Sequence, residues 1–250
     1  MEVLGIDIGG SGIKAAVVET ANGQLISERI RLETPQPATP DLIAHSVQEV
    51  IEKLDWKGLV GCSFPTVIVD GKCLTSGNIS QKWLNVQVDT LFKNHCNNSF
   101  FVANDADLAA LAEMKLGAGK DKTGKVITIT IGTGIGTGVF YNGQLIPNFE
   151  FGRMFYKKNK LIEHYAGSGA KKEKKLNLKD WAIRFDFFLN HLARITTPDF
   201  FILGGGISKK YEEFSHYLTV KTPTVAAHFR NDAGIVGAAL FAENENSKNT

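Results

Sequence analysis

Apolar residues alternate with polar or small ones on both sides of a glycine-rich turn near the start of the chain. The alternating apolar positions are Ile6 and Ile8 before the turn and Ile13, Ala15 and Val17 after it. This period of two residues is typical of β-strands. Asn22-Gly23 is a hairpin turn signal, so a third strand is expected over residues 24–32. The opening of the chain therefore predicts a β-meander.

The middle of the chain repeats this opening. A strand is expected over 125–131, followed by a Gly-rich turn and a second strand through Val139 and Phe140. The pentapeptide Asn-Gly-Gln-Leu-Ile occurs at 22–26 and again at 142–146, each time after a strand, a glycine turn and a strand. We interpret this as an internal duplication, which predicts two related lobes that each open with a β-meander.

Helical spacing of apolar residues appears between and after these meanders. A helix is expected to begin near Thr39, with Thr39 as its cap and Leu42 on its apolar stripe. Further helices are expected over 108–115, 178–195 and 233–243, and short buried strands over 59–64 and 200–203. The mixture of strands and helices predicts an α/β protein. We expect a smaller N-terminal lobe over 1–104 and a larger C-terminal lobe over 105–232. In 233–250, a helix should pack back on the first lobe, and its polar tail from 244 should fray.

Composition excludes several classes of protein. The 250 residues are 43% hydrophobic and 22% charged, which is ordinary for a globular chain. The net charge of +2 gives no reason to expect nucleic acid as a partner. Three cysteines without C-x-x-C spacing fit a reducing compartment, and no apolar run reaches the length of a membrane span. We expect a cytoplasmic protein without a membrane partner.

Two glycine-rich turns are candidates for phosphate binding, because closely spaced glycines let backbone N–H groups approach an anion. In the first, Asp7 could position a metal-bound phosphate and Lys14 could supply positive charge, although a plain hairpin turn with a structural Asp is equally compatible. Its loop residues are Gly9, Gly10, Ser11 and Gly12. The second turn contains Gly132, Thr133, Gly134 and Gly136. Neither is a dinucleotide-binding fingerprint, since G-x-G-x-x-G leading into a helix is missing.

Acidic and basic residues provide three further candidate sites for catalysis or ligand binding. In Asn104-Asp105-Ala106-Asp107, which joins a strand to a helix, Asp107 suits the helix cap and leaves Asp105 free to act as a general base. Glu150 to Arg153 could bind a polyhydroxylated ligand or could be an ordinary surface loop. Lysines recur at 157, 158, 160, 171, 172, 174 and 175. Such a run is usually a solvated face, but it could also follow a polyanion.

Together these motifs resemble the ROK family of sugar kinases, and most closely its polyphosphate-dependent glucokinase branch. The matching segments are GIDIGGSGIK, SFP, TSGNISQKW, NDAD, TIGTGIGTGVFYNGQLIPNFEFG, PDFFILGGGISKK and NDAGIVGAAL. They run in the family order from Gly5 to Leu240. The resemblance implies the actin-like ATPase fold with two RNase H-like lobes and an interlobe cleft. It also implies Mg²⁺-assisted transfer of a phosphoryl group from polyphosphate, ATP or both to the 6-hydroxyl of glucose or a related hexose.

The resemblance also implies roles for individual residues. Asp105 would be the general base, and Asp7 would hold Mg²⁺ indirectly. The residues implied to contact the sugar are Asn78, Asn104, Glu150, Arg153 and Glu163. Both glycine turns would bind phosphate, and the loop beside the adenosine of a nucleotide would be Gly204, Gly205 and Gly206. Family members commonly form homodimers, so a homodimer is expected here.

Two departures from the family pattern affect these expectations. Arg153 stands where the family has His, and Arg always carries charge and cannot accept a hydrogen bond. With Arg153 at this position, two alternatives remain open. The protein could be a kinase for an amino or acidic sugar, or it could be a sugar-binding homologue with impaired catalysis. None of the three cysteines lies near Glu150 in the sequence, so no zinc site is expected. No helix-turn-helix segment precedes the first strand, so DNA binding is not expected either.

Overall fold

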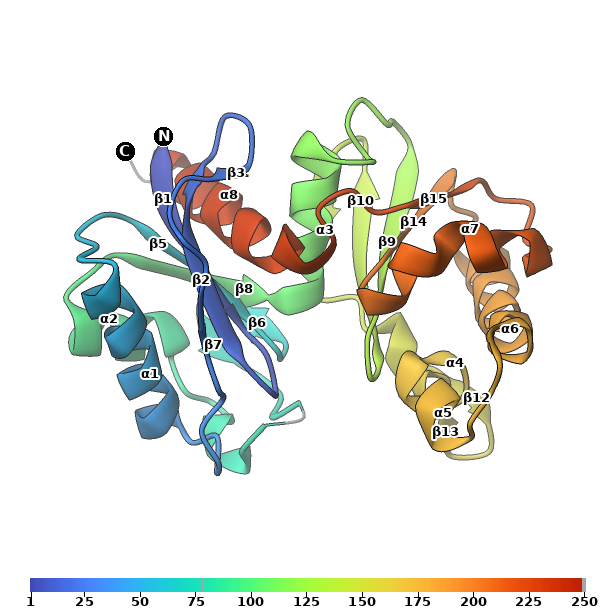
Figure 1. Ribbon diagram of the computed structural model, residues 1–250, viewed down its shortest axis with the longest axis horizontal. Helices are drawn as coiled ribbons and strands as arrows, with labels where there is room; N and C mark the ends of the chain where they lie inside the picture. Colours follow the sequence, from blue (N-terminus) through green and yellow to red (C-terminus); the bar gives the residue numbers. More distant parts are fainter. Residues whose placement is uncertain (78, 249–250) are drawn as a thin grey trace. The chain divides into compact units, whose positions relative to one another are not determined.

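The computed structural model describes residues 1–77 and 79–248 and has mixed α/β architecture (Figure 1). The chain divides into two compact units. Unit 1 contains residues 1–112 and 232–250, and unit 2 contains residues 113–231. Helix α3 (Asp105–Leu116) therefore begins in unit 1 and ends in unit 2. Among the described residues, the structure has no helix with the length and apolar character that crossing a membrane requires.

Unit 1 is built on a mixed sheet with the strand order β3-β2-β1-β5-β8, and β4 also pairs with β2. Strand β1 runs antiparallel to β2 and parallel to β5, and β5 runs parallel to β8. The strands are β1 (Glu2–Ile8), β2 (Ile13–Glu19), β3 (Gln24–Leu25), β4 (Ile30–Leu32), β5 (Val60–Phe64) and β8 (Phe100–Asn104). The parallel strands β1, β5 and β8 bring their carboxyl ends to one edge, where Asp7 and Asn104 lie.

The two faces of this sheet are covered differently. Alternate residues such as Leu4 and Ile6 face a core that includes residues of α1 (Pro40–Lys53) and α2 (Val88–Cys96). The opposite face is covered by α8 (Ala233–Lys248), and the contact is so close that a Cβ added to Gly5 would overlap the carbonyl of Ile235. Gly61 meets the carbonyl of Ala238 in the same way. The absent side chains allow helix and sheet backbones to touch.

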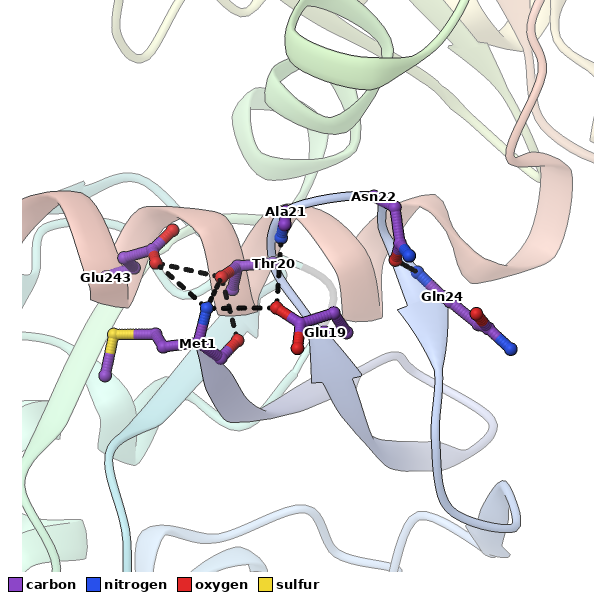
Figure 2. A network of polar contacts seen from close by, with 7 residues as sticks. All are labelled: Met1, Glu19, Thr20, Ala21, Asn22, Gln24 and Glu243. Carbon is purple, nitrogen blue, oxygen red and sulfur yellow. Dashed lines mark hydrogen bonds and ion pairs between the residues drawn. The ribbon is translucent and has the colours of Figure 1, made fainter.

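One end of unit 1 is tied by a polar network (Figure 2). The Met1 amino group donates to Glu19 Oε1 at 3.0 Å and to Thr20 Oγ1 at 2.8 Å, and Thr20 Oγ1 donates to Glu243 Oε1 at 2.8 Å. These contacts join the start of β1, the end of β2 and helix α8. The hydrogen bond that the amino group donates to Glu19 also raises the pKa of this amino group above its ordinary value.

Unit 2 contains a second mixed sheet with the order β11-β10-β9-β14-β15. Its strands are β9 (Lys125–Ile131), β10 (Ile135–Tyr141), β11 (Gln144–Ile146), β14 (Phe200–Gly204) and β15 (Thr224–Ala226). As in unit 1, an antiparallel meander is extended by parallel strands, because β14 runs parallel to both β9 and β15. The similar strand pattern supports the internal duplication.

The two Asn-Gly turns differ in length. In unit 2, Tyr141 pairs with Gln144, so Asn142 and Gly143 alone form the turn, and both have positive φ, as a type I′ turn requires. In unit 1, Glu19 pairs with Gln24, which leaves a four-residue loop over 20–23. The expected single strand over 24–32 is also wrong, since β3 ends at Leu25 and β4 begins at Ile30.

Helix α6 (Leu178–Thr196) supplies the core of unit 2. The five apolar residues predicted to share one face are all buried: Trp181, Phe185, Phe188, Leu189 and Leu192. They pack with Ile127, Ile129, Phe201 and Leu203 from the sheet. The helix begins after Asn177, whose side chain accepts a hydrogen bond from the Asp180 N–H, as an N-cap does.

Four further local predictions were wrong. Thr39 precedes α1 but makes no side-chain cap hydrogen bond, and Leu42 is exposed. Asp107 lies inside α3 rather than capping it. The polar tail is helical as far as Lys248, because its Glu, Asn and Lys residues are tolerated in helices and Lys248 pairs with Glu245 at 2.6 Å.

Short elements complete both units. Unit 1 has β6 (Ile68–Val69), β7 (Lys72–Cys73) and the 3₁₀ turn η1 (Gln81–Trp83), and η5 (Arg230–Asp232) crosses the boundary between the units. Unit 2 has η2 (Phe151–Arg153), β12 (Phe155–Lys157), β13 (Lys160–Leu161), α4 (Glu163–Ala166), α5 (Ser168–Glu173), η3 (Gly206–Lys210), α7 (Tyr211–Phe214) and η4 (Ser215–Tyr217).

Candidate active site

The first glycine turn connects β1 to β2 in unit 1. Ile8 pairs with Ile13, and the Gly9 N–H donates to the Gly12 carbonyl at 2.9 Å, which closes a four-residue loop. Gly10 is exposed, its φ is not left-handed, and an added Cβ would have nothing within 4 Å. The fold of the chain therefore does not explain why this position is glycine. Without a side chain, the backbone at this position is open to close approach by a ligand.

The carboxylate of Asp7 is held by three elements of unit 1. Lys14 Nζ on β2 lies 3.0 Å from Oδ2, and Ser63 Oγ on β5 donates to Oδ1 at 3.0 Å. From α8, Gly234 comes so close that a Cβ there would lie 2.7 Å from Asp7 Cγ and Oδ1. Sequence reasoning did not identify Ser63 or Gly234 as site residues. The one available signal was a hydroxyl at 63 in a short strand whose other residues are apolar or glycine.

Asn104 and Asp105 lie where β8 passes into α3. Asn104 is buried, and its Oδ1 accepts the N–H groups of Ala106 at 2.9 Å and Asp107 at 3.1 Å. Asn104 is therefore the N-cap that had been assigned to Asp107, and its amide also donates to the Thr66 carbonyl. Asp105 is partly exposed, and its Oδ1 accepts the Ala106 N–H at 2.8 Å. The cap fixes the backbone that presents the Asp105 carboxylate.

Asn78, predicted to contact a sugar, lies outside the described residues. The segments on both sides of it are tied to the core of unit 1. Thr75 Oγ1 accepts the Val67 N–H at 3.2 Å, and after the gap Trp83 is fully buried and donates its indole N–H to the Ala38 carbonyl at 2.8 Å.

The second glycine turn is shorter than expected. Ile131 pairs with Ile135, so the loop between β9 and β10 contains only Gly132, Thr133 and Gly134. Gly136 lies in β10, where it pairs with Thr130, and it is not part of the loop. Ser168 holds the loop by donating from both its N–H and its hydroxyl to the Gly132 carbonyl, at 3.0 and 2.6 Å. As at Gly10, a Cβ added to Gly132 would meet nothing within 4 Å.

Glu150, Arg153 and Glu163 form an electrostatic group in unit 2. Burial raises the pKa of Glu150, and the negative charge of Glu163 raises it further, while the guanidinium of Arg153 opposes both effects. Glu163 Oε2 also accepts the Ile135 N–H at 3.4 Å and lies where a Cβ of Gly134 would be. Arg153 therefore favours the charged form of Glu150, a role that its position in the sequence did not reveal.

The Gly204-Gly205-Gly206 segment begins with the last residue of β14. Gly205 has φ +81°, and a Cβ there would overlap the backbone of Ile131, so the fold itself requires glycine at this position. Gly206 has neither constraint, since a Cβ would meet nothing within 4 Å. Gly10, Gly132 and Gly206, one in each of the three predicted ligand loops, are thus positions at which an added Cβ would meet nothing within 4 Å.

The lysine run falls on two neighbouring parts of unit 2. Lys157, Lys158 and Lys160 are exposed on the β12–β13 hairpin. Lys171 lies on α5 and is partly exposed, whereas Lys172, Lys174 and Lys175 are fully exposed on α5 and just after it. No ion pair between these lysines and an acidic side chain occurs within residues 1–77 and 79–248.

Among residues 1–77 and 79–248, no group of three or more His, Cys, Asp or Glu side chains is arranged to hold a metal ion. Mg²⁺ does not need such a group, since it keeps several waters and uses one or two carboxylates together with substrate phosphates. Asp7 fits this kind of binding. Each of its carboxylate oxygens already accepts one hydrogen bond and can accept another, from a metal-bound water.

Comparisons with known proteins agree with these motifs. The model of the ROK family matches residues 3–148. The polyphosphate glucokinase of Mycobacterium tuberculosis (strain CDC 1551 / Oshkosh) is 42% identical over 237 residues, which cover 94% of this chain and 89% of that protein. The structure of the inorganic polyphosphate/ATP-glucomannokinase from Arthrobacter sp. strain KM aligns with a TM-score of 0.93 and 37% identity, over 98% of this chain and 99% of the other.

More distant proteins share the fold. A ROK family glucokinase from Streptomyces griseus, solved with glucose and AMPPNP, aligns with a TM-score of 0.78 at 23% identity, over 98% of this chain and 100% of the other. The two meander-based sheets described above have the actin-like ATPase architecture of these proteins. With a family model that matches more than half of its residues, this chain belongs to the ROK family.

Proposed function

We propose that the protein is a glucokinase-like hexose kinase, which transfers a phosphoryl group from polyphosphate, ATP or both to the 6-hydroxyl of glucose or a related hexose. The printed activities of the relatives support this: polyphosphate glucokinase for the 42% identical protein and polyphosphate/ATP-glucomannokinase for the structural neighbour. The observation that carries the proposal is Asp105, a partly exposed carboxylate fixed at the start of α3 by the Asn104 cap.

Asp105 would accept the proton of the sugar hydroxyl as that oxygen attacks the terminal phosphorus of the donor. The new bond joins the sugar oxygen to phosphorus, and the bond that breaks joins phosphorus to the bridging oxygen of the donor, which leaves with its electron pair. Phosphoryl transfer depends mostly on positioning and on neutralisation of charge. A carboxylate with a fixed orientation needs little reorganisation as the proton moves.

The sugar would be bound by carboxylate and amide side chains. Glu150 and Glu163 would accept hydrogen bonds from sugar hydroxyls, and Asn78 would add an amide. Asn104 is buried and already caps α3, so its main contribution would be to hold Asp105. Burial raises the pKa of Glu150, and the positive charge of Arg153 opposes this rise and so favours the ionised form that accepts hydrogen bonds.

The phosphates of the donor would lie against the open glycine positions. Backbone N–H groups of the loops at 9–12 and 132–134 would approach phosphate oxygens, and Gly206 would leave room beside the nucleotide when ATP is the donor. Mg²⁺, when bound, would neutralise phosphate charge, and Asp7 would hold one of its waters. Lys14 already pairs with Asp7. We therefore propose that Lys14 both positions Asp7 and contributes positive charge beside the phosphate-binding loop.

The exposed lysines of unit 2 favour polyphosphate as a donor. Seven cations lie on α5, just after it, and on the β12–β13 hairpin, and they make no acidic ion pair among the described residues. A surface of this kind attracts a long polyanion over several ångströms and raises its local concentration. A nucleotide, with only three phosphates, would gain less from it.

Arg153 supports a second candidate, a kinase for an acidic sugar. A guanidinium forms paired hydrogen bonds with a carboxylate, so a uronic acid or an acidic amino sugar could pair with Arg153 in place of Glu150. In this case the 6-hydroxyl acceptor would be replaced by another hydroxyl of the ring, because a uronic acid has no 6-hydroxyl.

A phosphoryl-transfer assay with the purified protein and Mg²⁺ separates these candidates. Glucose, mannose, an amino sugar and a uronic acid are each combined with ATP and with polyphosphate, and sugar phosphate is measured. Phosphorylation of glucose or mannose at the 6-position supports the first proposal, and product from the acidic sugar alone supports the second. If no pair of substrates gives product while the protein still binds sugar, the impaired-catalysis alternative holds.

A further inference from the structure

Thr137 is a buried polar residue on a face of β10 that is otherwise apolar. Ile135 and Val139, two residues before and after it, belong to the hydrophobic core of unit 2, and alternation along a strand places Thr137 on the same face as both. Thr137 is only 2% exposed. Valine has the same branched shape and would bury no polar group, so packing of the core does not explain a hydroxyl at this position.

The Thr137 hydroxyl binds the backbone on both sides of Glu150. Its Oγ1 donates to the Phe149 carbonyl and accepts the Phe151 N–H at 3.1 Å. These two groups belong to the two peptide bonds that flank Glu150. Because each peptide group is planar and rigid, holding both of them fixes the direction in which the Glu150 side chain leaves the backbone.

The segment around Glu150 is docked on β10 at a further point. The backbone at Gly152 comes so close that an added Cβ would lie 2.0 Å from the Ile135 carbonyl oxygen. The Arg153 N–H donates to the Glu150 carbonyl at 3.0 Å and closes the turn η2. Glu150 and Arg153 therefore belong to one short turn with a fixed place on the strand, which explains why the charge of the guanidinium acts on the carboxyl.

We propose that Thr137 is a positioning residue of the hexose site, which holds the Glu150 carboxylate in the orientation that accepts hydrogen bonds from sugar hydroxyls. Residues 147–150 lie in neither a helix nor a strand, and a binding group on irregular backbone needs support from a rigid element. The buried hydroxyl acts through the backbone of Glu150. The inference rests on the proposed function, because that function assigns Glu150 to the sugar.

The contacts of Thr137 also predict which substrate a change there should affect. Both hydrogen bonds of its hydroxyl described above go to the segment around Glu150. The phosphate loop at 132–134 is held by a different residue, since Ser168 donates twice to the Gly132 carbonyl. Loss of the Thr137 hydroxyl should therefore weaken hexose binding much more than donor binding.

Steady-state kinetics of three variants of the full chain test this selectivity. Thr137→Val removes the hydroxyl and keeps the branched shape, whereas Thr137→Ser keeps the hydroxyl. Thr128→Val is the matched control: Thr128 is 1% exposed on the adjacent strand β9, and its hydroxyl has no hydrogen-bond partner in the part of the chain that the structure describes.

The KM for the hexose should rise about tenfold in Thr137→Val, while kcat and the KM for the donor stay within about twofold of wild type. Thr137→Ser and Thr128→Val should resemble wild type in all three parameters. Circular dichroism and thermal melting establish that each variant is folded. If Thr137→Val does not fold, Thr137→Ala replaces it, because its smaller side chain does not force a methyl group against the Phe149 carbonyl.

A measurement without ligand separates this inference from the proposed function. The carboxyl carbon of Glu150 is followed by NMR across pH, with Glu150→Gln used for its assignment. In the wild type, burial raises the pKa of Glu150, Arg153 lowers it and Glu163 raises it. Loss of the Thr137 hydroxyl should let water reach the carboxyl, so its pKa should move toward the ordinary value in Thr137→Val and stay unchanged in Thr137→Ser and Thr128→Val.

The two measurements together have distinct outcomes. A wild-type protein that binds no hexose, combined with the expected change in the pKa of Glu150, would overturn the proposed function and still support the positioning of Glu150 by Thr137. A folded Thr137→Val with both the hexose KM and the Glu150 pKa of wild type overturns the inference. An equal rise of the hexose KM in Thr128→Val also overturns it, since loss of any buried hydroxyl would then have the same effect.

Discussion

Lys14 and Asp7 face each other directly across the first hairpin of unit 1, with 3.0 Å between Lys14 Nζ and Asp7 Oδ2. In the sequence, the two charges stand on opposite sides of the glycine turn and could both have pointed at a phosphate. The structure instead pairs them with each other, and Ser63 takes the second oxygen of the same carboxylate. The first glycine turn is therefore flanked by a carboxylate with a fixed orientation.

Lys14→Met should impair catalysis far more than folding. The Lys14 and Asp7 side chains are 31% and 17% exposed, so their ion pair is worth only about 0–1 kcal/mol of stability. Loss of the cation leaves Asp7 less well oriented and the phosphate less well neutralised, and we expect kcat to fall about a hundredfold. Steady-state kinetics at varied Mg²⁺ together with thermal melting measure both effects. A variant with normal kcat would show that Lys14 is dispensable.

Ser63 provides a milder test of the same arrangement. Ser63→Ala removes one hydrogen bond to Asp7, whereas Ser63→Thr keeps the hydroxyl. We expect the alanine variant to need more Mg²⁺ for half-maximal activity and the threonine variant to resemble wild type. Equal Mg²⁺ requirements in Ser63→Ala and wild type would argue that the bond to Asp7 is only structural.

Two adjacent glycines should respond differently to alanine. Gly206→Ala should leave the melting temperature unchanged, because its Cβ would enter open space, and should raise the KM for ATP more than the KM for polyphosphate. Gly205→Ala should destabilise the protein by about 1–3 kcal/mol, because an L-residue is strained at φ +81° and its Cβ would meet Ile131. Kinetics and chemical denaturation of both variants separate the ligand effect from the folding effect. If Gly206→Ala binds ATP normally, the nucleotide does not approach this position.

Charge reversal at Lys171 and Lys172 should distinguish the two donors. With both residues changed to Glu, we expect kcat/KM for polyphosphate to fall about tenfold or more, through weaker electrostatic attraction, while kcat/KM for ATP changes little. Lys115→Glu, at an exposed lysine of α3, serves as the control and should affect neither donor strongly. An equal loss of kcat/KM with both donors would contradict the proposal that this surface attracts polyphosphate.

Glu150 should make stability depend on pH. Its pKa is raised in the folded protein, chiefly by burial. A carboxyl group with a raised folded pKa favours the folded state below its unfolded pKa, and this contribution is lost as pH rises through the folded pKa. Glu150→Gln should therefore melt at a higher temperature than wild type at neutral pH, with a difference that shrinks in acid. The variant should also bind the hexose more weakly.

Arg153→Gln tests the effect of the guanidinium on the pKa of Glu150. Removal of the guanidinium should raise the pKa of Glu150 further, because Arg153 is the group that lowers it. The pH below which hexose binding declines should then move upward. Thermal melting and hexose KM, each measured across pH, check both variants. A Glu150→Gln protein that is no more stable than wild type at neutral pH would contradict the assigned cause of the shift.

The hydrophobic pattern of the sequence was sufficient to predict the large helices and strands. It was insufficient to predict where several of them begin or end. Trp181 and Leu192 could be assigned to one buried face because the core selects a repeat of 3.6 residues over the whole of α6. The cap of α3 could not be assigned, since Asn104 and Asp107 both suit a cap, and only the hydrogen bonds from Ala106 and Asp107 to Asn104 decide between them.

The candidate site was predictable where the motif is local and unpredictable where it depends on packing. The glycine turns are contiguous in sequence, so their loops could be located in advance, although the strand pairing placed Gly136 outside its loop. The contacts of Asp7 with Ser63 and Gly234 join positions far apart in sequence, and no local pattern indicates them. The same is true of the effect of Arg153 on Glu150, where the guanidinium opposes the rise in the pKa of the carboxyl.

The most direct test of the central claim compares wild type with Asp105→Asn in two assays, formation of sugar 6-phosphate and binding of the hexose. The substitution keeps the shape of the side chain and its hydrogen bond to the Ala106 N–H but removes the base. We predict that kcat falls by about 10²- to 10⁴-fold while the hexose dissociation constant and the melting temperature stay close to wild type. A folded Asp105→Asn enzyme with wild-type kcat would contradict the assignment of Asp105 as the general base.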